Sequence, residues 1–216
     1  MFTAMRLDDA HPTLAALQRL APETNVAGGS FAGWLPHPCT LQSAVRVEVL
    51  ASARRCAVDQ CIRILLQRVG LPINIQVRTG DRGDRLWPAG FAGSITHKGT
   101  VVLGVIAETA SIPMVGIDLE RMARAKIGAI EHTIAPEGLP RGVDRELATL
   151  LAFSAKEAVF KAGDPVSRWN LGFSDVSLAW LDHRDYYKAE VQCPVPGLEV
   201  RCICVGSWVL SAALAK

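Results

Sequence analysis

A glutamate and a lysine, Glu157 and Lys161, stand four residues apart in a stretch whose apolar residues recur at helical spacing. No glycine or proline interrupts residues 144–162, so a helix is expected there. Its geometry puts Glu157 and Lys161 on one face, one turn apart, with Ser154 one turn before them. Such a pair is either a surface ion pair of small energetic value or half of an active site.

A second pair of carboxylates precedes this helix, in the run Val115–Glu120. The apolar residues before Asp118, interrupted by one glycine, predict a buried strand. Because side chains alternate along a strand, Asp118 and Glu120 point to the same side of the sheet. Two carboxylates on one face repel each other unless a cation neutralises them, and Glu157 would supply a third. Mg²⁺ suits this set because it binds a few carboxylates, keeps several waters and takes other ligands from substrate phosphates.

Basic side chains gather in two other segments. Arg54 and Arg55 lie in a helix predicted from about residue 43 or 51 to residue 69, whose basic face is either solvated or binds phosphate. Residues 94–97 predict the end of a strand entering a turn, where His97 is exposed. The chain has neither of the common glycine-rich phosphate loops, so side chains would have to hold any phosphate.

The remaining segments predict an α+β protein. A weak helix is expected at 13–20, loops at 27–38 and 121–144, and strands at 73–78, 101–107, 173–178, 186–192, 198–205 and 208–214. Gly163 and Pro165 are expected to end the helix that carries Glu157. Residues 107–113 form a short polar link, so we expect two lobes, 1–110 and 111–216, each with a helix and several antiparallel strands.

The composition limits the class of protein. The chain has 216 residues, of which 50% are hydrophobic and 20% charged, as expected for a globular protein. Its net charge of +2 gives no support to nucleic-acid binding. No apolar run could span a bilayer and no signal-peptide core precedes residue 10, so we expect a cytoplasmic protein. The 6 cysteines lack zinc-site spacing, which favours buried, reduced thiols.

Several ordered motifs resemble the signature of the 4′-phosphopantetheinyl transferases of the surfactin-activating class, nearest the enterobactin-type subgroup. They are WPAG at 87–90, GSITH at 93–97, GIDLE at 116–120 and FSAKEAVFK at 153–161. The resemblance covers roughly residues 51–175. It implies two similar lobes, each a helix on a small mainly antiparallel sheet, with coenzyme A in the cleft between them. It also implies transfer of the phosphopantetheine arm to a serine of an apo acyl or peptidyl carrier protein, with release of 3′,5′-ADP.

The resemblance assigns catalytic and metal-binding roles. It makes Asp118, Glu120 and Glu157 the ligands of Mg²⁺, and Mn²⁺ accepts the same oxygen ligands. Glu157 would take the proton of the serine hydroxyl, directly or through water. Lys161 and His97 would contact the diphosphate and stabilise the departing phosphate oxygen.

The same resemblance places the nucleotide contacts. Arg54 and Arg55 match positions that reach the 3′-phosphate, and Arg82 or Arg85 would contribute nearby. An arginine suits this task because its planar fork grips phosphate with two hydrogen bonds. Thr96, within the GSITH motif, belongs to the same cofactor-binding group. Lys156 precedes Glu157 by one position, so helical geometry turns it aside and we expect it at the rim of the site.

The carrier protein and pathway remain open at this level. Non-ribosomal peptide, siderophore, polyketide and fatty-acid synthesis are all served by such enzymes, and residues 121–144 are expected to choose the carrier. Because two internal lobes would build the cleft, a monomer is expected. A non-catalytic coenzyme A-binding scaffold of a synthase complex is the alternative, and coincidental ion pairs in an unrelated α+β protein are a third hypothesis.

Overall fold

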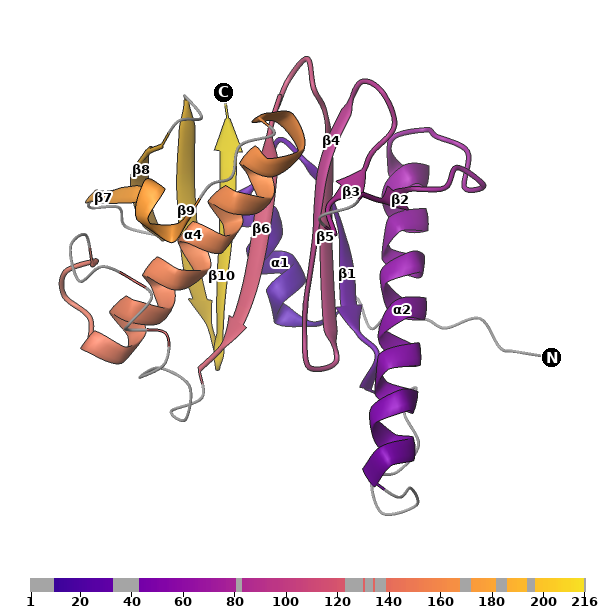
Figure 1. Cartoon of the computed structure of the whole chain (residues 1–216), viewed down its shortest axis with the longest axis horizontal. Helices are drawn as coiled ribbons and strands as arrows, with labels where there is room; N and C mark the ends of the chain where they lie inside the picture. Colours follow the sequence, from indigo (N-terminus) through magenta and orange to yellow (C-terminus); the bar gives the residue numbers. More distant parts are fainter. Residues whose placement is uncertain are drawn as a thin grey trace.

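Helices lie at both ends of the molecule with antiparallel strands between them (Figure 1). The computed structural model describes residues 10–32, 43–80, 83–122, 130, 134, 139–167, 172–181, 186–193 and 197–215. Its helices are α1 (Pro12–Leu20), α2 (Ser43–Arg68) and α4 (Arg145–Ser167), with a short 3₁₀ turn η4 (Phe173–Asp175). Its strands are β1 (Asn25–Ser30), β2 (Arg78–Thr79), β3 (Arg85–Leu86), β4 (Phe91–Lys98), β5 (Val101–Glu108), β6 (Val115–Arg121), β7 (Ser177–Leu181), β8 (Tyr187–Gln192), β9 (Leu198–Val205) and β10 (Trp208–Ala215).

The first half consists of α2 packed on a three-stranded antiparallel sheet in the order β1-β5-β4. Val102 and Ile106 of β5 point into the core beneath α2. Between them, Gly104 leaves the space that the helix needs, because a Cβ there would lie 2.8 Å from a methyl of Leu65 and 2.9 Å from the sulfur of Cys61. The sheet and helix are therefore in direct contact along this face.

The second half consists of α4 packed on a five-stranded antiparallel sheet in the order β6-β10-β9-β8-β7. Val209 and Ala213 of β10 face α4, whereas Leu210 and Leu214 face the opposite side. This alternation is what a strand buried on both faces requires. In Figure 1, α4 crosses the strands of this sheet.

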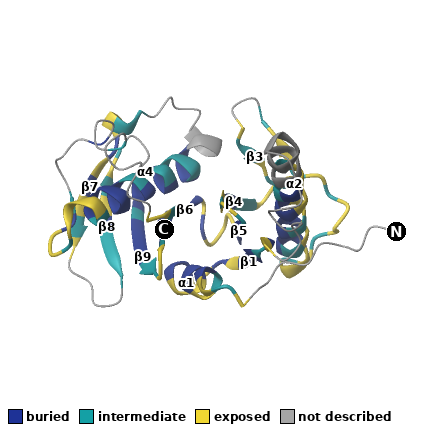
Figure 2. Ribbon diagram, turned by 90° about the horizontal axis from the view of Figure 1, so that it is seen from below, coloured by how far each residue is buried: buried dark blue, intermediate teal, exposed yellow. Residues whose placement is uncertain are grey.

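A hydrophobic core shared by both halves lies on the side of the second sheet opposite α4. It contains Leu17 and Leu20 of α1, Leu103 of β5, Ile117 of β6 and Leu210 of β10, all fully buried. Figure 2 shows α2 and α4 at opposite ends of the molecule, with α1 lying between them against the strands. Burial of this common surface fixes the two halves against each other.

The edges of the two sheets meet where β4 lies beside β6. The buried hydroxyl of Ser94 in β4 accepts a hydrogen bond of 3.1 Å from the backbone amide of Ile117 in β6. In β6, Gly116 lets α4 approach: a Cβ there would lie 2.0 Å from the carbonyl oxygen of Ala158 and 2.4 Å from the amide nitrogen of Ala162. The residues of β4, β6 and α4 that surround this contact are therefore held together by packing.

Most predicted elements are confirmed, including α1, α2, β5, β6 and β10, but four predictions are wrong. The expected loop at 27–38 begins inside β1, whose glycines lie against β5: a Cβ on Gly28 would be 2.3 Å from the carbonyl oxygen of Val102. Of the strand expected at 73–78, only Arg78 pairs with another strand, as part of β2. The strand expected at 173–178 begins instead with the 3₁₀ turn η4. The helix α4 continues past Gly163 and Pro165 to Ser167. Local propensity is a weak guide where tertiary packing opposes it, and α4 packs against β6 as far as Ala162.

The cysteines follow the prediction only in part. Cys61 and Cys202 are buried, and burial raises the pKa of each thiol to about 12. Cys56, however, is exposed on α2, and Cys39 lies outside the described residues. Within the described part of the chain, no helix is both long and apolar enough to cross a membrane.

Candidate active site

The side chain of Lys161 connects three elements at the contact between β4 and β6. Its ammonium group donates a hydrogen bond of 2.6 Å to Oδ1 of Asp118 in β6. It also lies 3.4 Å from the hydroxyl oxygen of Thr96 in β4. The structure therefore brings together predicted site residues that are separated by 65 positions in the chain.

A second ion pair, between Lys98 of β4 and Glu120 of β6, joins the same two strands with an N···O distance of 2.5 Å. The motif analysis did not single out Lys98. The alternation of side chains along a strand is the signal that could have found it: Thr96 and Lys98 are two residues apart in β4, so both point to the same face of the sheet. Two lysines thus lie against the two carboxylates of β6.

Glu157 shares this electrostatic environment. Burial raises the pKa of Glu157, and the negative charges of Asp118 and Glu120 raise it further, while Lys161 and Lys98 oppose the rise. Asp118 and Glu120 therefore lie near enough to Glu157 to influence its pKa, and their joint role as metal ligands stays a prediction. The second oxygen of Asp118, Oδ2, is buried and has no hydrogen-bond partner in the described structure.

The donor set suits a hard divalent cation. Such an ion accepts carboxylate oxygens and would relieve the repulsion among Asp118, Glu120 and Glu157. The unpartnered Oδ2 of Asp118 is an oxygen that a cation could use. Among the described residues, no group of three His, Cys, Asp or Glu side chains is arranged closely enough to hold a metal ion as it stands. The lysines neutralise Asp118 and Glu120, and the metal role of these residues stays a prediction.

Three cations act on His97. Partial loss of solvation lowers the pKa of His97, and the positive charges of Arg54, Lys161 and Arg85 lower it further. Arg54 also has a buried Nε atom with no partner in the described structure, whereas Arg85 donates a hydrogen bond of 2.8 Å to the hydroxyl of Thr79. This concentration of positive charge favours binding of an anion.

Of the other two predicted arginines, only Arg55 is described, and it is not brought into this group. Arg55 follows Arg54 on α2 and is exposed to solvent. Arg82 lies outside the described residues, as does most of the expected carrier-selecting segment 121–144. Their roles therefore stay predictions.

Lys156 lies in the interior, so its expected place at the rim is wrong. It is buried, and its ammonium donates a hydrogen bond of 2.8 Å to the backbone carbonyl of Phe173 in η4. Loss of solvation lowers the pKa of Lys156. The ring of Phe173 stacks on that of Phe153, one turn before Lys156, with centroids 5.7 Å apart. Lys156 therefore connects α4 to η4.

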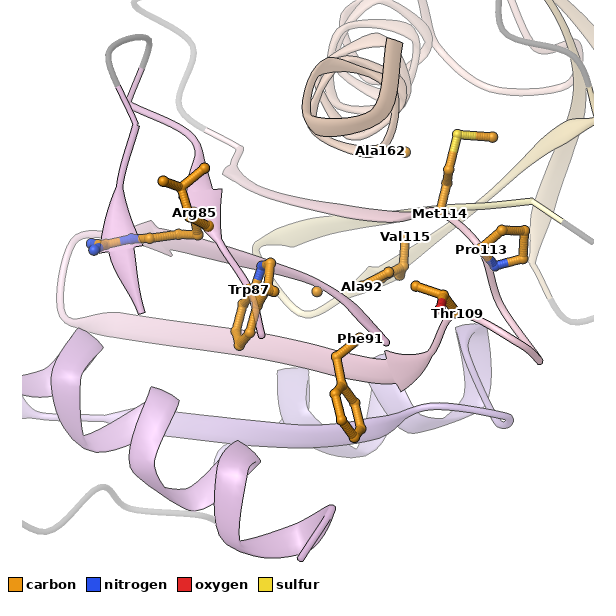
Figure 3. Close-up of a pocket in the computed structure, with 11 residues that line it drawn as sticks. Arg85, Trp87, Phe91, Ala92, Thr109, Pro113, Met114, Val115 and Ala162 are labelled. Atoms are coloured by element: carbon orange, nitrogen blue, oxygen red, sulfur yellow. The ribbon is translucent and has the colours of Figure 1, made fainter. Parts of the chain in front are cut away.

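A pocket of about 250 Å³ lies at the start of β4 and β6. Figure 3 shows Trp87, Phe91 and Ala92 along one side and Met114, Val115 and Ala162 along the other, with Arg85 at the end away from Pro113. The indole Nε1 of Trp87 is buried and has no partner in the described structure. Arg85, one of the cations that act on His97, is therefore part of the lining of this pocket.

Comparisons with known proteins identify the family of this chain. Residues 48–107 match the family model of the 4′-phosphopantetheinyl transferase N-terminal domain. The chain is 32% identical over 127 residues to the 4′-phosphopantetheinyl transferase PptT of Mycobacterium tuberculosis, covering 57% of this chain and 56% of that protein. It is 33% identical over 154 residues to enterobactin synthase component D of Escherichia coli, covering 67% of this chain and 68% of that protein. The chain belongs to the 4′-phosphopantetheinyl transferase family.

The matches to other members of the family are of similar extent. The 4′-phosphopantetheinyl transferase Svp of Streptomyces mobaraensis is 34% identical over 146 residues. With PptT and the next relatives, the matched segment spans little more than half of each relative's length. The part that matches the family model contains Arg54, Arg55, Thr96 and His97, whereas the carboxylates of β6 and α4 come later in the chain.

Proposed function

We propose that this protein transfers the 4′-phosphopantetheine arm of coenzyme A to a serine hydroxyl of an apo acyl or peptidyl carrier protein. The observation that carries the proposal is the contact of Lys161 with Asp118 and Thr96, since it joins the residues of three family motifs at one place. Around it lie a carboxylate with a raised pKa and a group of cations. These are the groups that phosphoryl transfer to a hydroxyl requires.

The proposed reaction moves one phosphorus atom. The serine oxygen forms a bond to the phosphorus that carries the pantetheine arm, and the bond from that phosphorus to the bridging oxygen breaks. The leaving group is 3′,5′-ADP. Glu157 accepts the serine proton, directly or through water, and the raised pKa of this carboxyl supports its role as a base.

The cations would stabilise negative charge. Lys161 and His97 are proposed to contact the diphosphate and the departing oxygen, and the effect of the Lys161 charge on the pKa of His97 supports a shared position. Asp118, Glu120 and Glu157 would hold Mg²⁺ or Mn²⁺. When bound, that ion would neutralise charge on the diphosphate.

Coenzyme A is proposed to lie between residues 1–110 and 111–216, taken as two lobes. Arg54, Arg55, Arg85 and Arg82 would bind the nucleotide phosphates. The proposal is supported by the pocket beside Arg85, whose lining comes from both parts of the chain, and by the end of the family-model match at residue 107. We also retain the predictions of a cytoplasmic monomer.

The carrier is proposed to belong to a secondary-metabolic synthase. Several relatives are named enterobactin synthase component D, which supports siderophore synthesis as the first pathway to test. Non-ribosomal peptide, polyketide and fatty-acid carriers are the others.

Calorimetry and product analysis together test this function. Coenzyme A should bind more tightly with Mg²⁺ than with EDTA, and 3′,5′-ADP should appear when an apo carrier is added. Binding of coenzyme A without product on any carrier would favour the non-catalytic scaffold. No binding under either condition would contradict both hypotheses.

A further inference from the structure

Each carboxylate of β6 that is proposed to hold a cation is paired with a lysine. Lys161 lies 2.6 Å from Asp118, and Lys98 lies 2.5 Å from Glu120. The carboxylates are largely buried, with 6% and 12% of their side-chain surface exposed, whereas the lysines keep 32% and 38% exposed. The carboxylates are thus held on the strand, and the longer lysine side chains reach them from the solvent side.

Of the two lysines, Lys98 is the one that a divalent cation could displace more easily from its carboxylate. Lys161 has a second neighbour, the hydroxyl of Thr96, and it projects from the packed helix α4. Lys98 stands at the end of β4, before the turn at Gly99, and is the more exposed. Its positive charge also acts on Glu157. The ion pair with Lys98 uses Oε2 of Glu120. A divalent cation on this carboxylate, even on its other oxygen, would be repelled by the ammonium a few ångströms away, so the two cations compete for Glu120.

We propose that Lys98 competes with the divalent cation for Glu120 in the free protein and moves to a phosphate oxygen of coenzyme A when coenzyme A binds, which frees Glu120 for the cation. This inference rests on the proposed function. The anion gives the displaced ammonium a new partner close to its old one. Cation and coenzyme A therefore assist each other's binding.

Linkage makes this statement quantitative. If coenzyme A raises the affinity for the cation by some factor, the cation raises the affinity for coenzyme A by the same factor. Removing Lys98 should raise cation affinity in the absence of coenzyme A, where the ammonium competes. Removing Lys98 should leave cation affinity unchanged in the presence of coenzyme A, because the ammonium has then already left Glu120. The coupling factor must then fall.

The experiment measures Mn²⁺ binding from the electron paramagnetic resonance signal of the free ion, with and without coenzyme A. Lys98→Met should bind Mn²⁺ alone roughly fivefold tighter than the wild type, within the range open to a partly exposed ion pair. Its coupling factor should fall by the same roughly fivefold. Lys98→Arg keeps a cation at the position and should retain most of the coupling. Lys188→Met removes a lysine paired at 2.8 Å with Glu199 on β9, away from the site, and should change neither affinity.

Three results would overturn the inference. An equal rise of Mn²⁺ affinity with and without coenzyme A would mean that Lys98 only repels the ion. Wild-type affinities in a Lys98→Met protein with an unchanged thermal transition would mean that Lys98 does not compete at all. A wild-type protein that binds no Mn²⁺ under either condition would overturn the proposed metal site together with this inference, which separates that failure from the other two.

Discussion

The ammonium of Lys161 lies 2.6 Å from Oδ1 of Asp118 and 3.4 Å from the hydroxyl of Thr96, so one side chain connects α4, β6 and β4. Thr96 belongs to the first half of the molecule, and the other two residues belong to the second. The same contact therefore joins the two halves and gathers the groups proposed to handle phosphate.

Loss of this lysine should affect both stability and activity. In Lys161→Met, the buried Asp118 loses its ion-pair partner, so the free energy of unfolding should fall by about 1–3 kcal/mol. Transfer to a carrier should slow by at least roughly 100-fold, because a cation on the phosphate is lost. Urea unfolding and the rate of transfer measure the two effects. Lys188→Met is the control, with little expected change in either, and a wild-type transfer rate in Lys161→Met would contradict the assigned role.

Gly116 should tolerate no side chain. Its missing Cβ would lie 2.0 Å from the carbonyl oxygen of Ala158, so Gly116→Ala must push α4 away from β6. We expect a loss of roughly 2–4 kcal/mol in the free energy of unfolding. Gly142→Ala is the control: its Cβ would meet nothing within 4 Å, and it carries only the strain of a φ of +79°, about 1 kcal/mol. Equal losses in the two variants would show that α4 does not depend on this close approach.

The pKa of His97 should depend on the charge of Arg54 nearby. Loss of solvation and the charge of Arg54 are the two largest causes that lower it. In NMR titrations, His97 of the wild type should therefore have a pKa below about 6.5, and Arg54→Gln should raise it. Arg63→Gln removes an exposed arginine from the same helix and should leave it unchanged. If Arg54→Gln had no effect on the titration, the two side chains would not be neighbours.

Glu157 should make the metal-free protein less stable as the pH rises. Burial, Asp118 and Glu120 raise its folded-state pKa, so the folded protein holds this proton more tightly than the unfolded chain does. Its stabilising contribution is complete below the unfolded-state pKa and is lost as the pH rises through the folded-state pKa.

In Glu157→Gln the side chain at this position is a neutral amide that does not ionise. The difference in free energy of unfolding, Glu157→Gln minus wild type, should therefore grow as the pH rises from the unfolded-state pKa through the raised folded-state value. Urea unfolding in EDTA across this interval measures it. A difference that is independent of pH would mean that Glu157 is not repelled by the carboxylates of β6.

Local patterns predicted the elements that carry the site. The i, i+2 spacing of Asp118 and Glu120 and the i, i+4 spacing of Glu157 and Lys161 follow from the periods of a strand and a helix, and the structure confirms both elements. Their meeting could be expected from the family resemblance alone, because contacts over such separations depend on how the sheets pack.

The failures share a physical origin in tertiary contact. From the sequence alone, the glycines of β1 predict a loop. In the structure they lie against β5, where the close approach of the two backbones requires residues without a side chain. Helical spacing fixes the direction in which Lys156 points, but it does not reveal which residues lie in that direction. In the structure, η4 lies there and supplies a backbone carbonyl that accepts a hydrogen bond from Lys156. Lys98 was overlooked because its role depends on the neighbouring strand β6, which its own segment does not reveal.

The most direct test is intact-mass spectrometry of a panel of apo acyl and peptidyl carrier proteins incubated with this protein, coenzyme A and Mg²⁺. At least one carrier should gain the mass of one phosphopantetheine, and EDTA or Glu157→Gln should abolish the gain. A gain that persists unchanged with Glu157→Gln would contradict the proposed base. No gain on any carrier, from a wild-type protein that binds coenzyme A, would contradict the transferase function.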